Sequence, residues 1–387
     1  MGKVIFTTSG QISGKGDGWR FESSAASGGI AFNPFEGYYP DKGGKLIAPK
    51  IPVVGGQYYR LRFSAKTPER SFEAVNFYDA SGKWLADNYD VIFAGGRQEY
   101  DRVVFATPGT AVIEVFFQTT CGVEAWDVEV SEASWEDAAK YCDCVYAQLL
   151  PLEFHPVGNP LALAPRTQKA LREGRPWRVL MLGDSIMQDT YHSQFHALLK
   201  RHFPNLAMEW LVSVRGGTGC WYYAEPEHFA EYVTPYRPDC VFIGGISHWN
   251  HPQAPWNGVT GIEETGRRIA EELGAEVVVM TPTLAQDFRL PEGTPSGTPC
   301  APMEFSLERA ECCRNGYNLL EYSKLDNICS NHGWPLWDMT TPAYKWLFAS
   351  GRPFEFYSRD ATHSGGLGKQ IIARIVEAFF LASNLNP

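Results

Sequence analysis

The sequence contains no run of about twenty apolar residues that would span a membrane, and no signal peptide is visible at its start. Paired CxxC motifs and an HExxH motif are also missing, so two common signatures of zinc sites are absent. Positive charge is in the minority: 34 Lys and Arg face 44 Asp and Glu, a net charge of −10. We therefore expect no membrane partner and no nucleic-acid partner, since nucleic-acid binding needs a basic face. The compartment stays open, periplasmic or secreted if a leader was removed and cytoplasmic otherwise.

Cysteine is present but forms no recognisable framework. The nine cysteines are odd in number and irregular in spacing, so one or two disulfides remain open. Aromatic residues, by contrast, are abundant, with 12 Trp and 18 Tyr. This fits a protein that stacks on sugar rings, and it fits the well-filled core of a β-sandwich equally. The length of 387 residues is enough for two domains.

Residues 1–135 are predicted to form an all-β domain. Short alternating segments recur at 58–64, 73–78, 100–106, 111–118 and 123–130. Turn signals such as Gly55-Gly56 and Pro108-Gly109 separate them, which is typical of a β-sandwich. The pattern resembles the jelly-roll, carbohydrate-binding modules appended to polysaccharide-active enzymes. Candidate sugar-stacking residues are Trp19, Tyr38, Tyr39 and Trp84, although core or loop packing is the favoured interpretation for each.

A connector follows at 136–176, with a helical segment, a Pro-rich run that suits a strap across the next domain, and a short helix. From 177 to 387, strands and helices alternate, which predicts a parallel sheet with helices on both faces. Strands are expected at 178–182, 207–213, 239–244, 276–281 and 334–338. Helices are expected at 186–202, 225–233, 259–273, 303–331, 342–349 and 366–382. A ligand of such a sheet lies outside the carboxyl ends of the strands.

The first of these strand ends carries a candidate nucleophile. The run Arg178-Val-Leu-Met-Leu-Gly-Asp-Ser185 is an apolar strand followed by a tight turn and a serine that opens a helix. Ser185 is therefore either a helix N-cap or a presented nucleophile. A serine hydroxyl is a weak nucleophile until a base takes its proton, and His363, in the loop before the last helix, can do so. Asp360, three residues earlier, can orient that imidazole.

Four blocks of sequence fall at the strand ends in the order found in SGNH/GDSL hydrolases, which the chain resembles from about 177 to 383. They are Gly183-Asp184-Ser185, Val214 to Cys220, Gly245-Ile246-Ser247-His248, and Asp360-Ala-Thr-His363. The resemblance implies a flavodoxin-like three-layer α/β/α domain, a Ser185–His363–Asp360 triad and no cofactor. It also implies an oxyanion hole made by the amides of Ser185 and Gly219. The family usually places Asn in the third block as a further donor. Here the donor is Ser247, Asn250 or neither.

The second and third blocks also resemble a bacterial subgroup of carbohydrate esterases that carry an N-terminal β-sandwich. Those enzymes remove acyl groups, typically acetyl, from polysaccharides or oligosaccharides. The resemblance implies that Arg215 contacts sugar or a carboxylate, that Trp221 stacks on the substrate, and that His248 binds it. Core packing is the alternative role for Trp221.

Three other functions remain open. His248, His251, Asp360 and His363 are a possible ligand set for a metal-dependent deacetylase. The same acyl-enzyme, attacked by a sugar hydroxyl instead of water, would make an O-acyltransferase. A decayed esterase domain would leave a non-catalytic carbohydrate-binding protein. We expect an esterase acting on an acylated carbohydrate without metal or organic cofactor. The polysaccharide, the ester position and the oligomeric state are not fixed by the sequence.

Overall fold

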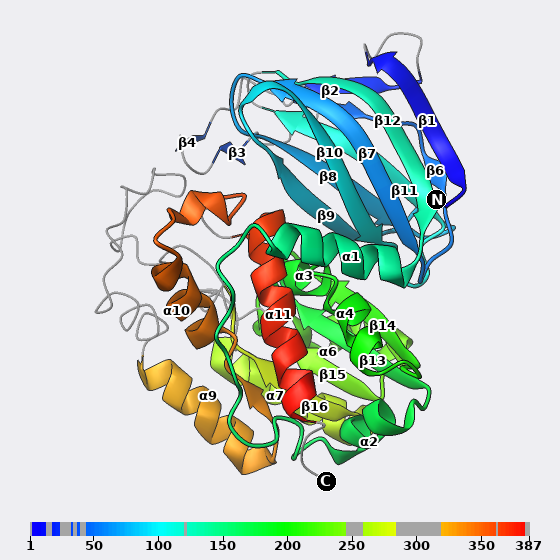
Figure 1. Ribbon diagram of the computed structural model, residues 1–387. Helices are drawn as coiled ribbons and strands as arrows, with labels where there is room; N and C mark the ends of the chain where they lie inside the picture. Colours follow the sequence, from blue (N-terminus) through cyan, green and yellow to red (C-terminus); the bar gives the residue numbers. More distant parts are fainter. Residues whose placement is uncertain are drawn as a thin grey trace.

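The computed structural model describes residues 2–12, 18–23, 32–33, 37–38, 44–119, 122–244, 258–283, 319–360 and 363–383. It is a mixed α/β structure in which antiparallel sheets lie against a region built on one parallel sheet (Figure 1). Helix α1 lies along the antiparallel part, and the start of α11 lies close to it (Figure 1). No described helix is long and apolar enough to cross a membrane.

The first sheet of the sandwich has the order β1-β12-β7-β10. Its strands are β1 (Val4–Gln11), β12 (Glu124–Ala133), β7 (Tyr58–Thr67) and β10 (Gly95–Phe105). The second sheet has the order β2-β5-β11-β8-β9, and β6 also pairs with β11. Its strands are β2 (Arg20–Ser23), β5 (Gly44–Ile47), β11 (Val112–Thr119), β8 (Ser71–Tyr78), β9 (Trp84–Ile92) and β6 (Ile51–Pro52). A separate pair joins β3 (Phe32–Asn33) to β4 (Gly37–Tyr38).

The inner faces of the two sheets form an aromatic core. Phe63 from the first sheet meets Phe117 from the second edge-on, with ring centroids 5.0 Å apart. Trp19 stacks on Phe117 at 5.8 Å and is only 4% exposed. Trp19 is therefore a core residue, which is the favoured interpretation of the sequence. Tyr39 and the side chain of Tyr38 lie outside the described part of the chain.

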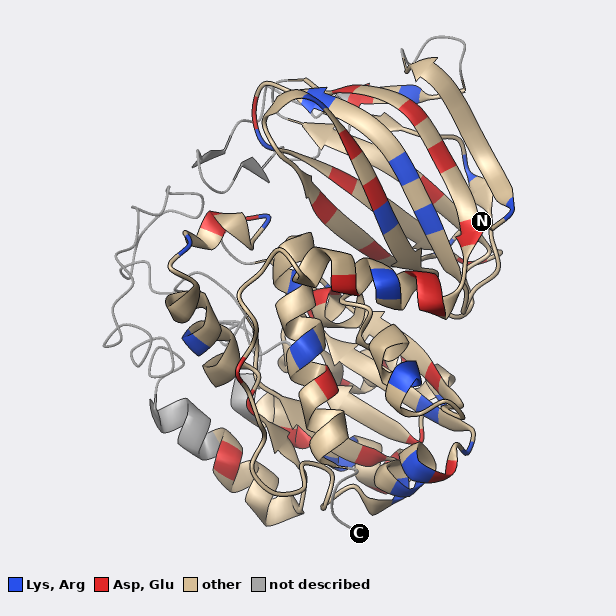
Figure 2. Cartoon of the chain, viewed as in Figure 1, with Lys and Arg blue, Asp and Glu red and all other residues tan. Residues whose placement is uncertain are grey.

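Charged residues recur along the strands of the first sheet (Figure 2), and several of them are exposed. Cross-strand ion pairs join Arg60 to Asp101 at 2.6 Å and Lys66 to Glu124 at 3.1 Å. Exposed pairs of this kind contribute little to stability, about 0–1 kcal/mol each. They do make the face of the sheet that carries them hydrophilic, so the face that packs on other elements is the opposite one.

The connector begins with α1 (Trp135–Tyr146) and ends with α2 (Pro165–Glu173). Ser134 and Asp137 form a capping box at the start of α1, because the Ser134 hydroxyl accepts the Asp137 amide and the Asp137 carboxylate accepts the Ser134 amide. The extended strap between the two helices is held through a hydrogen bond to its backbone. The Trp337 indole donates to the Pro160 carbonyl at 3.0 Å.

The parallel sheet has the order β14-β13-β15-β16-β17. Its strands are β13 (Trp177–Gly183), β14 (Met208–Val214), β15 (Cys240–Ile243), β16 (Glu276–Met280) and β17 (Leu336–Trp337). Alternate side chains of β13 enter different cores. Val179 and Met181 join one buried cluster, and Leu180 and Leu182 join another. Both faces of the sheet are thus covered, as the apolar strand sequences predict.

One face of this sheet carries α3 (Ser185–Tyr191), α4 (Phe195–His202), α10 (Thr340–Ser350) and α11 (Gly366–Ala382). The other carries α5 (Cys220–Ala224), α6 (Pro226–Tyr232), α7 (Gly258–Leu273) and α9 (Leu319–His332). Short 3₁₀ turns are η1 (Thr234–Tyr236) and η2 (Phe354–Phe356). The predicted helix at 366–382 is confirmed. Of the helix predicted at 303–331, residues before 319 lie outside the described chain.

The prediction of one helix over 186–202 is wrong. The helix breaks into α3 and α4 at His192–Gln194, where Gln194 adopts a left-handed φ of 65°. The break fits against the sandwich: Gln194 donates to the Val103 carbonyl, and His192 stacks on Phe77 at 5.4 Å. A single buried apolar cluster consequently runs from the sandwich core into the helices of the α/β region.

Buried charges also cross this interface. Arg102 of β10 pairs with Asp90 and lies 3.2 Å from Glu73, and Asp90 accepts the amide of Gly366 at the start of α11. Glu73 is 2% exposed. Burial raises the pKa of Glu73 to about 7, although the Arg102 guanidinium favours its ionised form.

The raised pKa of Glu73 makes stability depend on pH. Between its ordinary value of 4.5 and about 7, the folded protein binds more protons at Glu73 than the unfolded chain does. This contribution to the free energy of unfolding therefore falls as pH rises through that window. Glu73→Gln, which stays neutral, should gain stability relative to wild type between pH 5 and pH 8 in urea unfolding. The partly exposed control Glu129→Gln should show no such trend, and equal differences for Glu73→Gln at both pH values would contradict the assignment.

Candidate active site

The turn after β13 presents Ser185 at the carboxyl edge of the parallel sheet. A Cβ atom at Gly183 would lie 2.4 Å from the carbonyl oxygen of Gly244, so the close approach of β13 and β15 requires glycine there. Asp184 is buried, and its carboxylate accepts the Ile186 amide at 2.9 Å. Asp184 is thus the N-cap of α3, and Ser185 is the first helical residue rather than the cap. The Ser185 hydroxyl is left for other contacts.

Ser185, His363 and Asp360 form a continuous chain of hydrogen bonds. His363 Nε2 lies 2.7 Å from Ser185 Oγ. His363 Nδ1 lies 2.8 and 2.7 Å from the two carboxylate oxygens of Asp360. Because an ionised carboxylate only accepts, Nδ1 carries the proton and Nε2 accepts from the serine hydroxyl. This is the geometry in which a histidine takes the proton of a serine that attacks a carbonyl carbon.

The loop that carries Asp360 and His363 is short and closed on itself. Ser358 and Ser364 form an antiparallel bridge, and the Arg359 amide donates to the His363 carbonyl at 2.9 Å. The Asp360 carboxylate also accepts the His363 amide at 2.8 Å, which fixes the spacing of the pair.

Two residues that sequence reasoning missed hold this loop against α3. Asp189 accepts from the Arg359 guanidinium at 2.7 Å and from the Ser364 amide at 2.9 Å. It therefore binds the loop on both sides of the Asp360–His363 pair. Its position four residues after Ser185, one helical turn, was the available signal. Arg359 directly precedes Asp360.

The loop after β14 reaches the same edge of the sheet. The Arg215 amide donates to the Gly183 carbonyl at 3.0 Å, and the Tyr223 hydroxyl donates to it at 2.7 Å. Cys220 Sγ lies 3.1 Å from the Gly244 carbonyl. Gly219, which precedes α5, is thereby held beside the turn of Ser185. Within the described residues, no hydrogen-bond acceptor is found for the amides of Ser185 and Gly219, and their role as oxyanion donors stays a prediction.

The remaining predicted oxyanion and binding residues of the third block cannot be placed. Ser247, His248, Asn250 and His251 all lie outside the described residues. The identity of a third oxyanion donor, the binding role of His248 and the alternative metal-ligand set therefore stay predictions. Among the residues that the structure does describe, no three His, Cys, Asp or Glu side chains are grouped to hold a metal ion.

Arg215 and Trp221 both lie on the segment after β14, as expected from their spacing. The Arg215 guanidinium lies over the Tyr232 ring at 3.9 Å and over Trp84 of the sandwich at 5.7 Å. Trp221 lies in the first turn of α5, half-buried, with its ring edge-on to Tyr222 at 6.0 Å. Arg215 is thus a contact point between the sandwich and the segment that carries Gly219.

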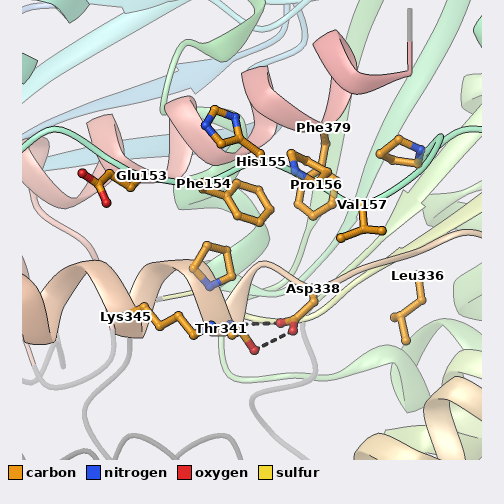
Figure 3. Close-up of a pocket in the computed structure, with 12 residues that line it drawn as sticks. Glu153, Phe154, His155, Pro156, Val157, Leu336, Asp338, Thr341, Lys345 and Phe379 are labelled. Atoms are coloured by element: carbon orange, nitrogen blue, oxygen red, sulfur yellow. Dashed lines mark hydrogen bonds between the residues drawn. The ribbon is translucent and has the colours of Figure 1, made fainter. Parts of the chain in front are cut away.

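A cavity of about 430 Å³ lies away from these residues, between the strap and α10 (Figure 3). Phe154 and Pro156 line it on one side, and Thr341 and Lys345 line it on the other. Asp338 also lines the cavity, and its carboxylate accepts hydrogen bonds from the Thr341 amide at 3.0 Å and from the Thr341 hydroxyl at 2.6 Å. Asp338 therefore accepts an amide of the first turn of α10, whose N-cap residue is Met339. None of the residues that line this cavity belongs to the Ser185–His363–Asp360 chain.

Comparisons with known proteins give only distant structural similarity. No model of a known protein family matches the sequence, and no curated protein does. The enzymatically active domain of tailspike protein 4 from bacteriophage CBA120 is 21% identical at a TM-score of 0.22, over 27% of this chain and 15% of that one. A two-domain esterase active on acetylated mannans is 14% identical at a TM-score of 0.40, over 59% of this chain and 54% of that one. A catalytic mutant of an acetylxylan esterase from Geobacillus stearothermophilus is 15% identical at 0.40, over 53% and 94%.

This chain thus matches about half the length of the mannan esterase. Carbohydrate acetyl esterases are among its structural neighbours. The TM-scores of these esterases are both below 0.5.

Replacing the nucleophile or the base should remove turnover. Ser185→Ala and His363→Ala are each expected to lower hydrolysis of a chromogenic acetate ester by about 10⁴-fold, because attack needs both groups together. The double variant should be little worse than either single one. Ser81→Ala, an exposed serine of the sandwich, is the control and should keep full turnover. More than a tenth of wild-type activity in Ser185→Ala would show that another group is the nucleophile.

Proposed function

We propose that the chain is a serine esterase of the SGNH type that removes O-acyl groups, chiefly O-acetyl, from a polysaccharide or oligosaccharide. The observation that carries this proposal is the hydrogen-bond chain from Ser185 through His363 to Asp360. His363 is 23% exposed and Asp360 13%, so substrate can reach the base while its partner is shielded.

The topology supports the SGNH assignment. Numbered along the chain from β13, the parallel sheet has the order 2-1-3-4-5, which is that of flavodoxin-like folds. In such folds the ligand lies at the carboxyl ends of the strands, beside the point where the strand order reverses. Ser185 follows β13, the strand at that point, and Gly219 follows its neighbour β14.

The proposed reaction begins with attack of Ser185 Oγ on the ester carbonyl carbon. His363 Nε2 takes the serine proton, and Asp360 remains ionised and stabilises the imidazolium. The amides of Ser185 and Gly219 bind the developing oxyanion, a contribution of roughly 10²–10³ in rate for each such donor. The sugar oxygen leaves with the proton from His363. Water, deprotonated by His363, then attacks the acyl-enzyme and releases the acid.

Both ring nitrogens of His363 take part in this arrangement, one to Ser185 and one to Asp360. In the metal-dependent alternative, one of them would have to bind the ion instead. The acyltransferase alternative uses the same residues and differs only in the alcohol that attacks the acyl-enzyme. The binding-protein alternative predicts no turnover at all.

Release of acetate from a panel of acetylated polysaccharides separates these functions. We expect acetate release and hydrolysis of a chromogenic acetate ester, both insensitive to exhaustive chelation, and phosphonate labelling that Ser185→Ala abolishes. Activity lost on chelation and restored by zinc would favour the deacetylase. Transfer of acetyl to an added sugar, faster than release of acetate, would favour the acyltransferase.

A further inference from the structure

A buried arginine lies directly behind the catalytic pair. Arg359 is 6% exposed, and its Nε lies 3.7 Å from a carboxylate oxygen of Asp360. Its terminal nitrogen donates to Asp189 at 2.7 Å. Its guanidinium lies over the Tyr89 ring, 5.0 Å from the centroid. Three structural parts therefore meet on one side chain: the catalytic loop, the helix of the nucleophile through Asp189, and sandwich strand β9 through Tyr89.

Strand β9 also holds the other cation of this cluster. The Lys369 ammonium lies 3.6 Å from Asp189 and donates to Asn88 Oδ1 and to the Tyr89 carbonyl, both at 2.6 Å. Strand β9 of the sandwich thus contacts both Lys369 and Arg359. Asp189, which is 2% exposed, has both cations as partners. A buried carboxylate without such partners would be strongly destabilising.

We propose that Arg359 is a positioning residue for Asp360 and His363, and that strand β9 of the sandwich is thereby part of the catalytic apparatus. This inference depends on the proposed function. Arg359 touches no reacting atom. It holds the Asp360 carboxylate in the orientation that binds His363 Nδ1, and it carries a positive charge that opposes a second positive charge on the imidazole.

The charge predicts a pH effect that a purely structural role does not. The charged groups that face Arg359 are Asp360 on its own loop, Asp189 on α3, Lys369 on α11 and Asp87 on β9. When the Arg359 charge is removed, the carboxylates of Asp360, Asp189 and Asp87 have one cationic partner fewer. The protonated form of His363 then becomes easier to form, so the pH at which His363 titrates should rise.

The test compares Arg359→Gln and Arg359→Lys with Arg374→Gln. Arg374 is the matched control because it is a half-buried arginine that pairs with Asp143 and Glu377 at 2.7 and 2.9 Å, away from the triad. Turnover is counted per phosphonate-titrated site, so that loss of folded protein does not count as loss of catalysis. The acid limb of kcat/KM and the NMR titration of His363 are measured in parallel.

We expect Arg359→Gln to lower kcat by about 10- to 100-fold with KM changed less than about threefold, because only the orientation of the base is lost. The acid limb and the His363 titration should move up by about half a pH unit or more. Arg359→Lys should keep the wild-type titration and recover part of kcat. Arg374→Gln should change thermal stability alone.

If Arg359→Gln keeps wild-type turnover per site and an unmoved acid limb, the positioning role is wrong and Arg359 only stabilises the fold.

If Arg359→Gln does not fold, Tyr89→Leu takes its place, because it removes the ring beneath the guanidinium and leaves every charge. A loss of about 3- to 10-fold in kcat per site is then expected, and unchanged kcat overturns the proposal. Failure of the proposed function gives a different result, since wild type itself would then hydrolyse no ester while the NMR titration still reports on Arg359.

Discussion

The Asp189 carboxylate is the point on which the geometry of the site depends. It lies one turn after Ser185 on α3, and through Arg359 and Ser364 it binds the loop that carries Asp360 and His363. A serine and a histidine that come from opposite ends of the domain sequence are thereby held 2.7 Å apart. Burying Asp189 is unfavourable unless it has cationic partners, and Lys369 and Arg359 supply them. Both cations also contact the sandwich: Lys369 donates to Asn88 and to the Tyr89 carbonyl, and Arg359 lies over the Tyr89 ring.

This dependence changes the expected relation between the two parts of the chain. An appended carbohydrate-binding module would share few contacts with the catalytic region, and its removal would leave that region intact. Here the apolar core is continuous across the junction, and the His192–Gln194 turn reaches into the sandwich. The Arg70 guanidinium donates to the Glu355 carbonyl at 2.7 Å and to the Ser358 carbonyl, at the base of the catalytic loop. The sandwich is therefore a structural support of the loop.

The sequence predicted well those elements whose structure depends on residues close together in the chain. The strand, turn and helix around Ser185 follow from an apolar run, a glycine and a capping aspartate within ten residues, and α11 follows from its apolar stripe. The break at His192–Gln194 was missed because it is produced by packing against Phe77 and Val103, far away in the chain. Strand β9 was missed because many of its polar side chains meet the catalytic region, so it lacks a simple alternation. Asp189 and Arg359 were missed because their partners are distant in the chain. The spacing from Ser185 marks Asp189, but it does not indicate that Arg359 and Lys369 are its partners.

The loop that carries Asp360 and His363 depends both on contacts that are local in sequence and on contacts with distant residues. The bridge from Ser358 to Ser364 and the bonds from Asp360 to both the amide and the imidazole of His363 are local. They bring the Asp360 carboxylate and the His363 imidazole together within the loop, where Arg359 also contacts Asp360. What they do not fix is where this rigid unit stands relative to Ser185. Among the described residues, contacts of Asp189, Arg70 and strand β9 hold this loop against the rest of the fold. The contacts within the Asp360–His363 pair are therefore local in sequence, whereas the position of the pair beside Ser185 depends on tertiary contacts.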